Sequence, residues 1–173
     1  WDKSVLDRFA VDYRDPNKKI PSDTLDKMEQ ARQATIGTWY RRQLSFGMLD
    51  LKLHLSTDEK DFENLVEVSN EIMTDVYLEP PNSTAFVASF GHLGGGYDAG
   101  YYGYAWAEAI SADMASVFEK SPGGLMDKDV GIRLREEIYA KGGSREIDDS
   151  ITAFLERDRA LQPCFEYIGL GNE

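Results

Sequence analysis

The sequence predicts a mainly α fold. Apolar residues recur with helical spacing through most of the chain, and caps and breakers separate the segments that carry this pattern. Strand patterns are weak and are limited to residues 76–78 and 85–90. At 173 residues, with 42% hydrophobic and 29% charged residues, the chain has the composition of a globular protein and the length of one domain. We therefore expect several helices, little strand and no internal repeats.

Two helices are predicted in the first third of the chain. Residues 4–13 carry one apolar helical stripe, and a turn at residues 14–19 ends that helix. A longer helix is predicted over residues 22–55, which would measure about 50 Å at 1.5 Å per residue if unbroken. Gly37 and Gly47 interrupt its pattern, and each marks either close packing or a kink.

The next predicted helix covers residues 56–75. Ser56 and Glu59 have the spacing of a capping box at its start. A proline-containing linker at residues 79–84 follows it and leads into a glycine-rich loop.

The helices of the second half are delimited by caps and glycines. Asp127 and Ser144 are predicted N-caps, and Gly142 and Gly143 are predicted to stop a helix at its C-terminus. The helices are expected at residues 99–119, 128–141 and 144–157, with a short apolar helix or turn at 162–168.

The most biased stretch of the chain is Phe90-Gly-His-Leu-Gly-Gly-Gly-Tyr-Asp-Ala-Gly-Tyr-Tyr-Gly-Tyr-Ala-Trp106. Glycine, tyrosine and one of only two histidines crowd into these seventeen residues. Because glycine permits positive φ and close approach of a ligand, Gly94, Gly95 and Gly96 predict a loop that either turns sharply or wraps a ligand.

A row of tyrosines follows this loop. In a helix, Tyr97, Tyr101 and Tyr104 would lie on one face, at spacings of four and three residues. A phenol is an uncharged donor at neutral pH, which suits a carbonyl oxygen that gains negative charge during a reaction. Aromatic packing at a helix interface explains the same row. The residues alone leave catalysis and packing open.

The same run, written Phe-Gly-His-Leu-x-Gly-Gly-Tyr-Asp-Ala-x-Tyr-Tyr-Gly-Tyr-x-Trp, resembles the signature of the thimet oligopeptidase, neurolysin and oligopeptidase A family of zinc metallopeptidases. The similarity covers essentially the whole chain. It extends to Tyr40-Arg-Arg-Gln-Leu44, residues 46–54, Gly142-Gly-Ser144 and Gly169-Leu170. The resemblance implies a zincin-type oligopeptidase catalytic domain.

The metal-binding motif of that family is not in this sequence. Family members bind zinc through H-E-x-x-H on one helix and a glutamate on a following helix. This chain has only His54 and His92, and it begins with Trp1 rather than methionine. We therefore expect residues 1–173 to be the C-terminal segment of a longer peptidase whose zinc ligands lie upstream. Alone, this segment is expected to bind no zinc and to be inactive.

The resemblance also assigns candidate site residues. The candidate catalytic residues, which would hydrogen-bond the substrate backbone or the oxyanion, are His92, Tyr97 and Tyr104. The candidate substrate-binding residues are Gly94, Gly95, Gly96 and Tyr101.

Other polar and aromatic residues near this stretch have structural interpretations. Asp98 is expected to cap a helix or to interact with its dipole, and His54 is expected to favour the C-terminal end of the long helix. Arg42 is expected in a buried ion pair, with a substrate contact as the alternative. Tyr102 and Trp106 are expected in the core.

Charge and composition limit the possible partners. A formal net charge of −12 argues against nucleic acid and anionic membranes, which require clustered Lys and Arg. It is compatible with cationic or neutral peptides, or simply with a solvated acidic surface. No run of about eighteen apolar residues predicts a membrane span. The single Cys164 cannot form an internal disulfide, which a reducing compartment or an absence of selection for bridges explains. The predicted location is the cytoplasm.

The resemblance implies hydrolysis of internal bonds of short peptides. In that activity this segment would supply the substrate-binding and oxyanion-stabilising side of the cleft, and the upstream part of the same polypeptide would supply the zinc. Two alternatives stay open: a dipeptidyl carboxypeptidase of the same family, and a non-catalytic helical module that binds an extended peptide.

Overall fold

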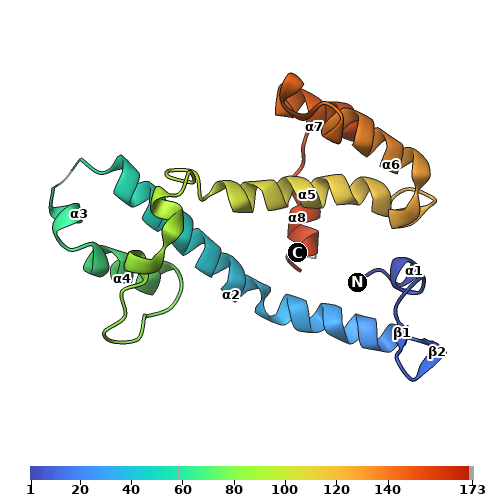
Figure 1. The fold of residues 1–173 in the computed structure, drawn as a ribbon, viewed down its shortest axis with the longest axis horizontal. Coiled ribbons are helices and arrows are strands. Elements are labelled where there is room, and N and C mark those ends of the chain that lie inside the picture. The colour runs from blue at the N-terminus through green and yellow to red at the C-terminus, as the bar shows by residue number, and fades with distance from the viewer. Residues whose placement is uncertain (58, 172–173) are drawn as a thin grey trace. The chain divides into compact units, whose positions relative to one another are not determined.

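The computed structural model describes residues 1–57 and 59–171, and it is mainly α-helical, as the sequence predicts (Figure 1). The described α-helices are α1 (Lys3–Leu6), α2 (Ser22–Leu55), α3 (Lys60–Glu63), α4 (Leu65–Val76), α5 (Gly103–Glu119), α6 (Lys128–Leu134), α7 (Ile147–Leu155) and α8 (Gln162–Tyr167). The strands β1 (Val11–Asp12) and β2 (Asp15–Lys19) form an antiparallel hairpin. Shorter turns of 3₁₀-helix lie at Phe86–Ser89, Gly91–Gly94, Gly124–Met126 and Gly142–Ser144, and a π-helical turn lies at Arg135–Tyr139.

The chain divides into two compact units. Unit 1 comprises Trp1–Ala34 and the described residues from Glu108 onward, and unit 2 comprises Thr35–Ala107. Both α2 and α5 contribute residues to each unit. Every residue of the predicted glycine and tyrosine site belongs to unit 2.

Helix α2 confirms the longest predicted helix, over residues 22–55. Its first turn holds Asp23, and its last turn holds His54 and Lys52, a distribution of charge that the helix dipole favours. A Cβ added at Gly47 would lie 3.5 Å from the Tyr102 Cα, an ordinary van der Waals distance, so this glycine faces Tyr102 within unit 2.

The core of unit 2 joins α2, α4 and the segment that leads into the glycine loop. Its buried side chains are Phe46, Leu49, Met73, Phe90 and Tyr101. The ring of Phe46 stacks on Phe86 at a centroid distance of 4.7 Å and contacts Phe90 at 5.2 Å. Because these rings pack against a helix, the segment that carries them needs no strand partner. The weak strand prediction for residues 85–90 is therefore wrong.

The predicted helix over residues 56–75 begins too early. The described chain forms the one-turn helix α3, and α4 begins only at Leu65. The Asn64 side chain accepts a hydrogen bond from the Glu67 amide at 3.3 Å, so it starts a new helix as an N-cap. The weak strand prediction for residues 76–78 is also wrong, since α4 runs to Val76.

The N-terminal helix predicted over residues 4–13 is also wrong beyond Leu6. The Asp12 carboxylate accepts the Arg14 amide at 2.9 Å, and this local bond favours a tight turn over a helix. The hairpin of β1 and β2 results, and Phe9 and Tyr13 of the predicted stripe remain exposed.

The core of unit 1 is centred on α7. Its buried residues are Ile151, Phe154 and Leu155, and the partly buried residues packed on them are Ile110, Met114, Val117, Phe118, Val130, Leu134 and Ile138. Asp127 caps α6 as predicted, accepting the amides of Asp129 and Val130. Ser144 does not cap α7, which begins at Ile147, because Ser144 ends a 3₁₀ turn and donates its hydroxyl to the Lys141 carbonyl.

A buried ion pair ties α5 to the segment after α7 within unit 1. The Asp113 side chain, with 1% of its surface exposed, accepts hydrogen bonds from the Arg157 guanidinium and, at 2.8 Å, from the Ala160 amide. Burial by itself raises the pKa of Asp113, but these hydrogen bonds outweigh it and hold the pKa below its ordinary value.

Candidate functional site

The predicted site residues gather in one aromatic cluster of unit 2, with His92 at its centre. The His92 ring lies 5.5 Å from Tyr97, 5.1 Å from Tyr101 and 5.9 Å from Tyr104, measured between ring centroids. The rings of Tyr97 and Tyr104 stack on each other at 5.4 Å. The cluster also contacts the unit 2 core, because Phe90 lies 5.2 Å from His92.

A loop, not a helix face, brings the tyrosines together. Helix α5 begins at Gly103, so Tyr97 and Tyr101 precede it, and the prediction that the three tyrosines share one helix face is wrong. The chain forms a 3₁₀ turn at Gly91–Gly94 and further turns up to α5. These turns return the chain on itself and stack Tyr97 on Tyr104.

The three tyrosines differ in how accessible they are. Tyr97 and Tyr104 expose 49% and 44% of their surface, whereas Tyr101 exposes 7%. The Tyr101 hydroxyl donates to the Gln43 Oε1 at 2.8 Å, so it already has a partner within unit 2. Tyr97 and Tyr104 can present their phenols to a ligand. The substrate-binding role of Tyr101 stays a prediction.

Two phenols of this cluster, those of Tyr104 and Tyr101, have a raised pKa. A hydrogen bond with Tyr97, with burial as the next cause, raises the pKa of Tyr104 above the ordinary value of 10.0. Burial also raises the pKa of Tyr101. Each group is therefore a hydrogen-bond donor, which is the role that an oxyanion-stabilising residue requires.

Two hollows adjoin the cluster. One has a volume of about 500 Å³ and is lined by Phe46, Phe86, Ser89, Phe90, Gly91, His92, Gly95, Tyr97 and Tyr101. The other has a volume of about 200 Å³ and is lined by Gln43, Leu44, Gly47, Met48, Leu51, Tyr101, Tyr102, Tyr104 and Ala105. Tyr101 lines both hollows, with His92 and Tyr97 on one and Tyr104 on the other.

Two of the three consecutive glycines are required by the backbone. A Cβ at Gly95 would lie 2.7 Å from the Gly91 carbonyl oxygen, and Gly96 has a φ of +87°. Gly94 has open space where a Cβ would be. The sharp turn of the backbone thus explains why glycine occupies positions 95 and 96. That all three glycines contact a substrate stays a prediction.

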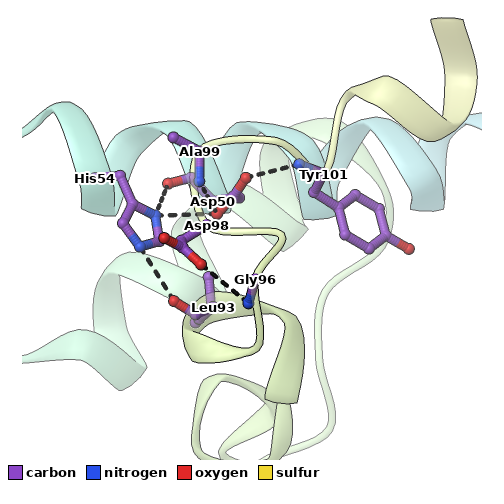
Figure 2. A network of polar contacts seen from close by, with 7 residues as sticks. All are labelled: Asp50, His54, Leu93, Gly96, Asp98, Ala99 and Tyr101. Carbon is purple, nitrogen blue, oxygen red and sulfur yellow. Dashed lines mark hydrogen bonds and ion pairs between the residues drawn. The ribbon is translucent and has the colours of Figure 1, made fainter. Parts of the chain in front are cut away.

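Beside the loop, one turn of α2 makes a network of polar contacts (Figure 2). The Asp50 carboxylate, with 1% of the side chain exposed, accepts the amides of Ala99 at 3.0 Å and Tyr101 at 2.9 Å. His54 Nδ1 lies 2.9 Å from the Asp50 carbonyl oxygen and 3.0 Å from its Oδ1, and His54 Nε2 lies 3.1 Å from the Leu93 carbonyl oxygen.

The electrostatics of this network favour a charged His54. The bond to the Asp50 carbonyl is the largest cause that raises the pKa of His54, and it outweighs the opposing effect of burial. The Asp50 charge, the Leu93 carbonyl and the Asp98 charge raise it further. The sequence predicted a structural His54 but missed Asp50; the spacing of an Asp and a His four residues apart on one helix was the available signal.

Other expectations near the loop are corrected. Asp98 does not cap a helix, because α5 begins five residues later, and its Oδ1 instead accepts the Gly96 amide at 3.1 Å in a turn. Tyr102 and Trp106, expected in the core, instead expose 56% and 55% of their surface. The Arg42 guanidinium lies over the Phe46 ring, 4.7 Å from its centroid, in a cation–π contact.

The described residues do not fit a zinc site. Among residues 1–57 and 59–171, no three His, Cys, Asp or Glu side chains lie close enough together to hold a metal ion. What this part of the chain offers is a set of hydrogen-bond donors beside a hollow. In the same described ranges, no helix combines the length and the apolar character needed to cross a bilayer.

Comparison with known proteins places these features in context. The model of peptidase family M3 matches residues 1–170. A thimet-like oligopeptidase from Dictyostelium discoideum is 38% identical over 172 residues, which are 98% of this chain and 25% of that protein. Oligopeptidase A from Salmonella typhimurium is 31% identical over 98% of this chain and 25% of its own length. A dipeptidyl carboxypeptidase from the same organism is 28% identical over 96% of this chain and 24% of its own length.

These matches confirm the resemblance noted from the glycine and tyrosine run. The chain spans about a quarter of the length of the curated relatives it matches.

Proposed function

The chain belongs to peptidase family M3, and from this premise we propose that it is the C-terminal segment of the catalytic domain of a zinc-dependent oligopeptidase. The full-length protein would hydrolyse internal bonds of short peptides. Residues 90–106 would provide the substrate-binding and oxyanion-stabilising side of its cleft. The observation that carries the proposal is the cluster of His92 with the accessible phenols of Tyr97 and Tyr104, each of which lines one of the two adjoining hollows.

The chemistry of this cluster is electrostatic stabilisation. Tyr97 and Tyr104 donate hydrogen bonds to the scissile carbonyl oxygen as it gains negative charge, and His92 binds the substrate backbone or the same oxygen. Removing one such donor costs a few kcal/mol, or roughly 10²–10³ in rate. The glycines allow the loop backbone to approach the peptide backbone, which all substrates share, so side chains of different sizes are accepted.

The rest of the proposal concerns the full-length protein. Zinc would be held by residues outside this chain, so the isolated chain would be inactive. The partners would be short peptides and the remainder of the same polypeptide, and neither nucleic acid nor membrane. We place the protein in the cytoplasm, a proposal supported by a relative named as a probable cytosolic oligopeptidase A.

The test is the kinetics of Tyr104→Phe in the full-length protein. The substitution removes the hydroxyl and keeps the ring, so kcat should fall about 10²–10³-fold while KM changes little. Tyr139→Phe is the matched control, because Tyr139 is 73% exposed on the π-helical turn of unit 1 and should leave kcat unchanged. An unaltered kcat in Tyr104→Phe would remove the oxyanion role.

Two further measurements separate the alternatives. Wild-type hydrolysis should stop on chelation and return on addition of zinc; binding of peptides without any hydrolysis would instead indicate a non-catalytic peptide-binding module. The relative named dipeptidyl carboxypeptidase makes that activity the second candidate. Equal cleavage of substrates with a free and an amidated C-terminus supports the endopeptidase, whereas strict dependence on the free carboxylate supports the dipeptidyl carboxypeptidase.

A further inference from the structure

One turn of α2 contacts both ends of the glycine-rich loop. His54 reaches the Leu93 carbonyl just before the three glycines, and Asp50 reaches the Ala99 and Tyr101 amides after them (Figure 2). Asp50 and His54 are four residues apart on the helix and contact each other. A single rigid element therefore holds the loop at its start and at its end.

The backbone conformation at Ala99 indicates that these contacts constrain the loop. Ala99 has a φ of +56°, in the left-handed region that a residue with a Cβ rarely adopts. Such a conformation costs about 1–3 kcal/mol and persists only where the surroundings enforce it. The Asp50 carboxylate provides that enforcement, since it accepts the amide of this residue and also the amide two positions later.

The geometry of His54 favours its charged state. Nδ1 faces the Asp50 carbonyl and carboxylate oxygens, and Nε2 faces the Leu93 carbonyl oxygen. These groups are all acceptors, so only the imidazolium, with a proton on each ring nitrogen, can donate to both sides at once. The charged groups that face the ring are Asp50 from α2 and Asp98 from the loop, and both favour the imidazolium. With 29% of its side chain exposed, His54 can exchange its proton with solvent.

We propose that Asp50 and His54 are a positioning pair that clamps the glycine-rich loop and so holds His92 and Tyr97 in the arrangement that binds substrate. Neither residue touches the substrate. The pair acts through the Leu93 carbonyl and the Ala99 and Tyr101 amides. This inference rests on the proposed function for its effect on catalysis, but its effect on the loop stands independently.

The clamp has a defined pH dependence. The pKa of His54 is higher in the folded protein than in the unfolded chain, so the contribution of the imidazolium is fully present below the ordinary pKa of 6.5 and is lost as the pH rises through the raised value. The neutral ring has one N–H, so it must release either Leu93 or Asp50. The loop should therefore loosen as the solution becomes alkaline.

The first measurement is amide hydrogen exchange in the full-length protein, corrected for intrinsic rates. In Asp50→Asn the Ala99 and Tyr101 amides lose a charged acceptor, so their exchange should accelerate about 10–100-fold. In His54→Gln the side-chain amide can still donate to Leu93 but does not titrate, so the change of loop protection with pH should disappear. Asp113→Asn is the matched control, because Asp113 is equally buried and also accepts a backbone amide, but that amide belongs to Ala160 rather than to the loop.

The second measurement is peptide hydrolysis by the same variants. Displacement of the loop should lower kcat/KM about 10–100-fold in Asp50→Asn. In His54→Gln the loss of activity that the wild type shows toward alkaline pH should be reduced. Asp113→Asn should neither accelerate amide exchange in the loop nor alter the pH profile of hydrolysis.

The outcomes distinguish the two proposals. Unchanged exchange at Ala99 and Tyr101 in Asp50→Asn, or the same change in the Asp113 control, would overturn the clamp. Loosening of the loop with unaltered kcat/KM would overturn its positioning role. Absence of any hydrolysis by the wild type would defeat the proposed function, while the exchange measurement would still decide whether the clamp exists.

Discussion

At the scale of single residues, the glycine loop is constrained most at Gly95. A Cβ at this position would lie 2.7 Å from the Gly91 carbonyl oxygen, which is backbone and cannot move aside cheaply, whereas a Cβ at Gly94 meets nothing. Gly95→Ala should therefore lower the stability of the loop by about 1–3 kcal/mol more than Gly94→Ala does. Amide exchange of residues 91–101 in the two variants measures this difference. Equal exchange would show that the backbone does not require Gly95.

The members of the aromatic cluster could be found from composition, but their geometry could not. The bias of the sequence toward glycine and tyrosine is local, so it identifies residues 90–106 directly, and the family resemblance then singles out His92, Tyr97 and Tyr104 within them. The prediction that helical spacing places the three tyrosines on one face is wrong, because α5 begins only at Gly103. The amides that Asp50 binds lie 49 and 51 residues further along the chain, so its spacing of four residues from His54 was the only local signal, and that spacing does not reveal the loop as its partner.

At the scale of elements, local signals decided which predictions succeeded. The limits of α2 and the cap of α6 at Asp127 depend on spacing and on capping within a few residues, and both are confirmed. The helix predicted over residues 4–13 is wrong for two reasons. The Asp12 carboxylate stabilises a competing turn by accepting the Arg14 amide. A short helix needs tertiary packing to be stable, and Phe9 and Tyr13 are exposed rather than packed on another element.

The contact between α5 and the segment after α7 can be tested at Asp113. Asp113→Asn leaves the Arg157 guanidinium without its charge partner, and because 38% of Arg157 is exposed, we expect a loss of about 1–3 kcal/mol near pH 7. The pKa of Asp113 is depressed in the folded state, so its contribution is present above the ordinary value of 3.8 and disappears as the pH falls through the folded value.

Thermal denaturation of the wild type and Asp113→Asn, compared at neutral and acidic pH, measures this effect. The two proteins should differ at pH 7 and converge on acidification. A difference that persists unchanged in acid would show that the carboxylate charge is not what stabilises this contact.

At the scale of the whole molecule, the residues that the structure describes form two hydrophobic cores, one in each unit. Phe154 and Leu49 are fully buried, the first in unit 1 and the second in unit 2. Composition and length predicted enough apolar material for a core, but which helices share a core depends on contacts between distant residues. Periodicity therefore predicted the helices but not which of them pack into the same core.

A matched pair of cavity variants tests this division. Phe154→Ala should cost about 3–5 kcal/mol and Leu49→Ala about 2–5 kcal/mol. In the full-length protein, hydrogen exchange should increase mainly in unit 1 for the first variant and mainly in unit 2 for the second. Equal increases in both units for either variant would mean that the cores unfold as one.

The left-handed backbone of Ala99 has a consequence for the entropy of the loop. In the unfolded chain, three consecutive glycines give residues 94–96 the largest conformational freedom that a backbone can have, and a glycine at position 99 would extend that freedom. Alanine, held at a φ of +56°, ends it. Fewer backbone states therefore have to be given up when the loop folds into the turns that carry the aromatic cluster.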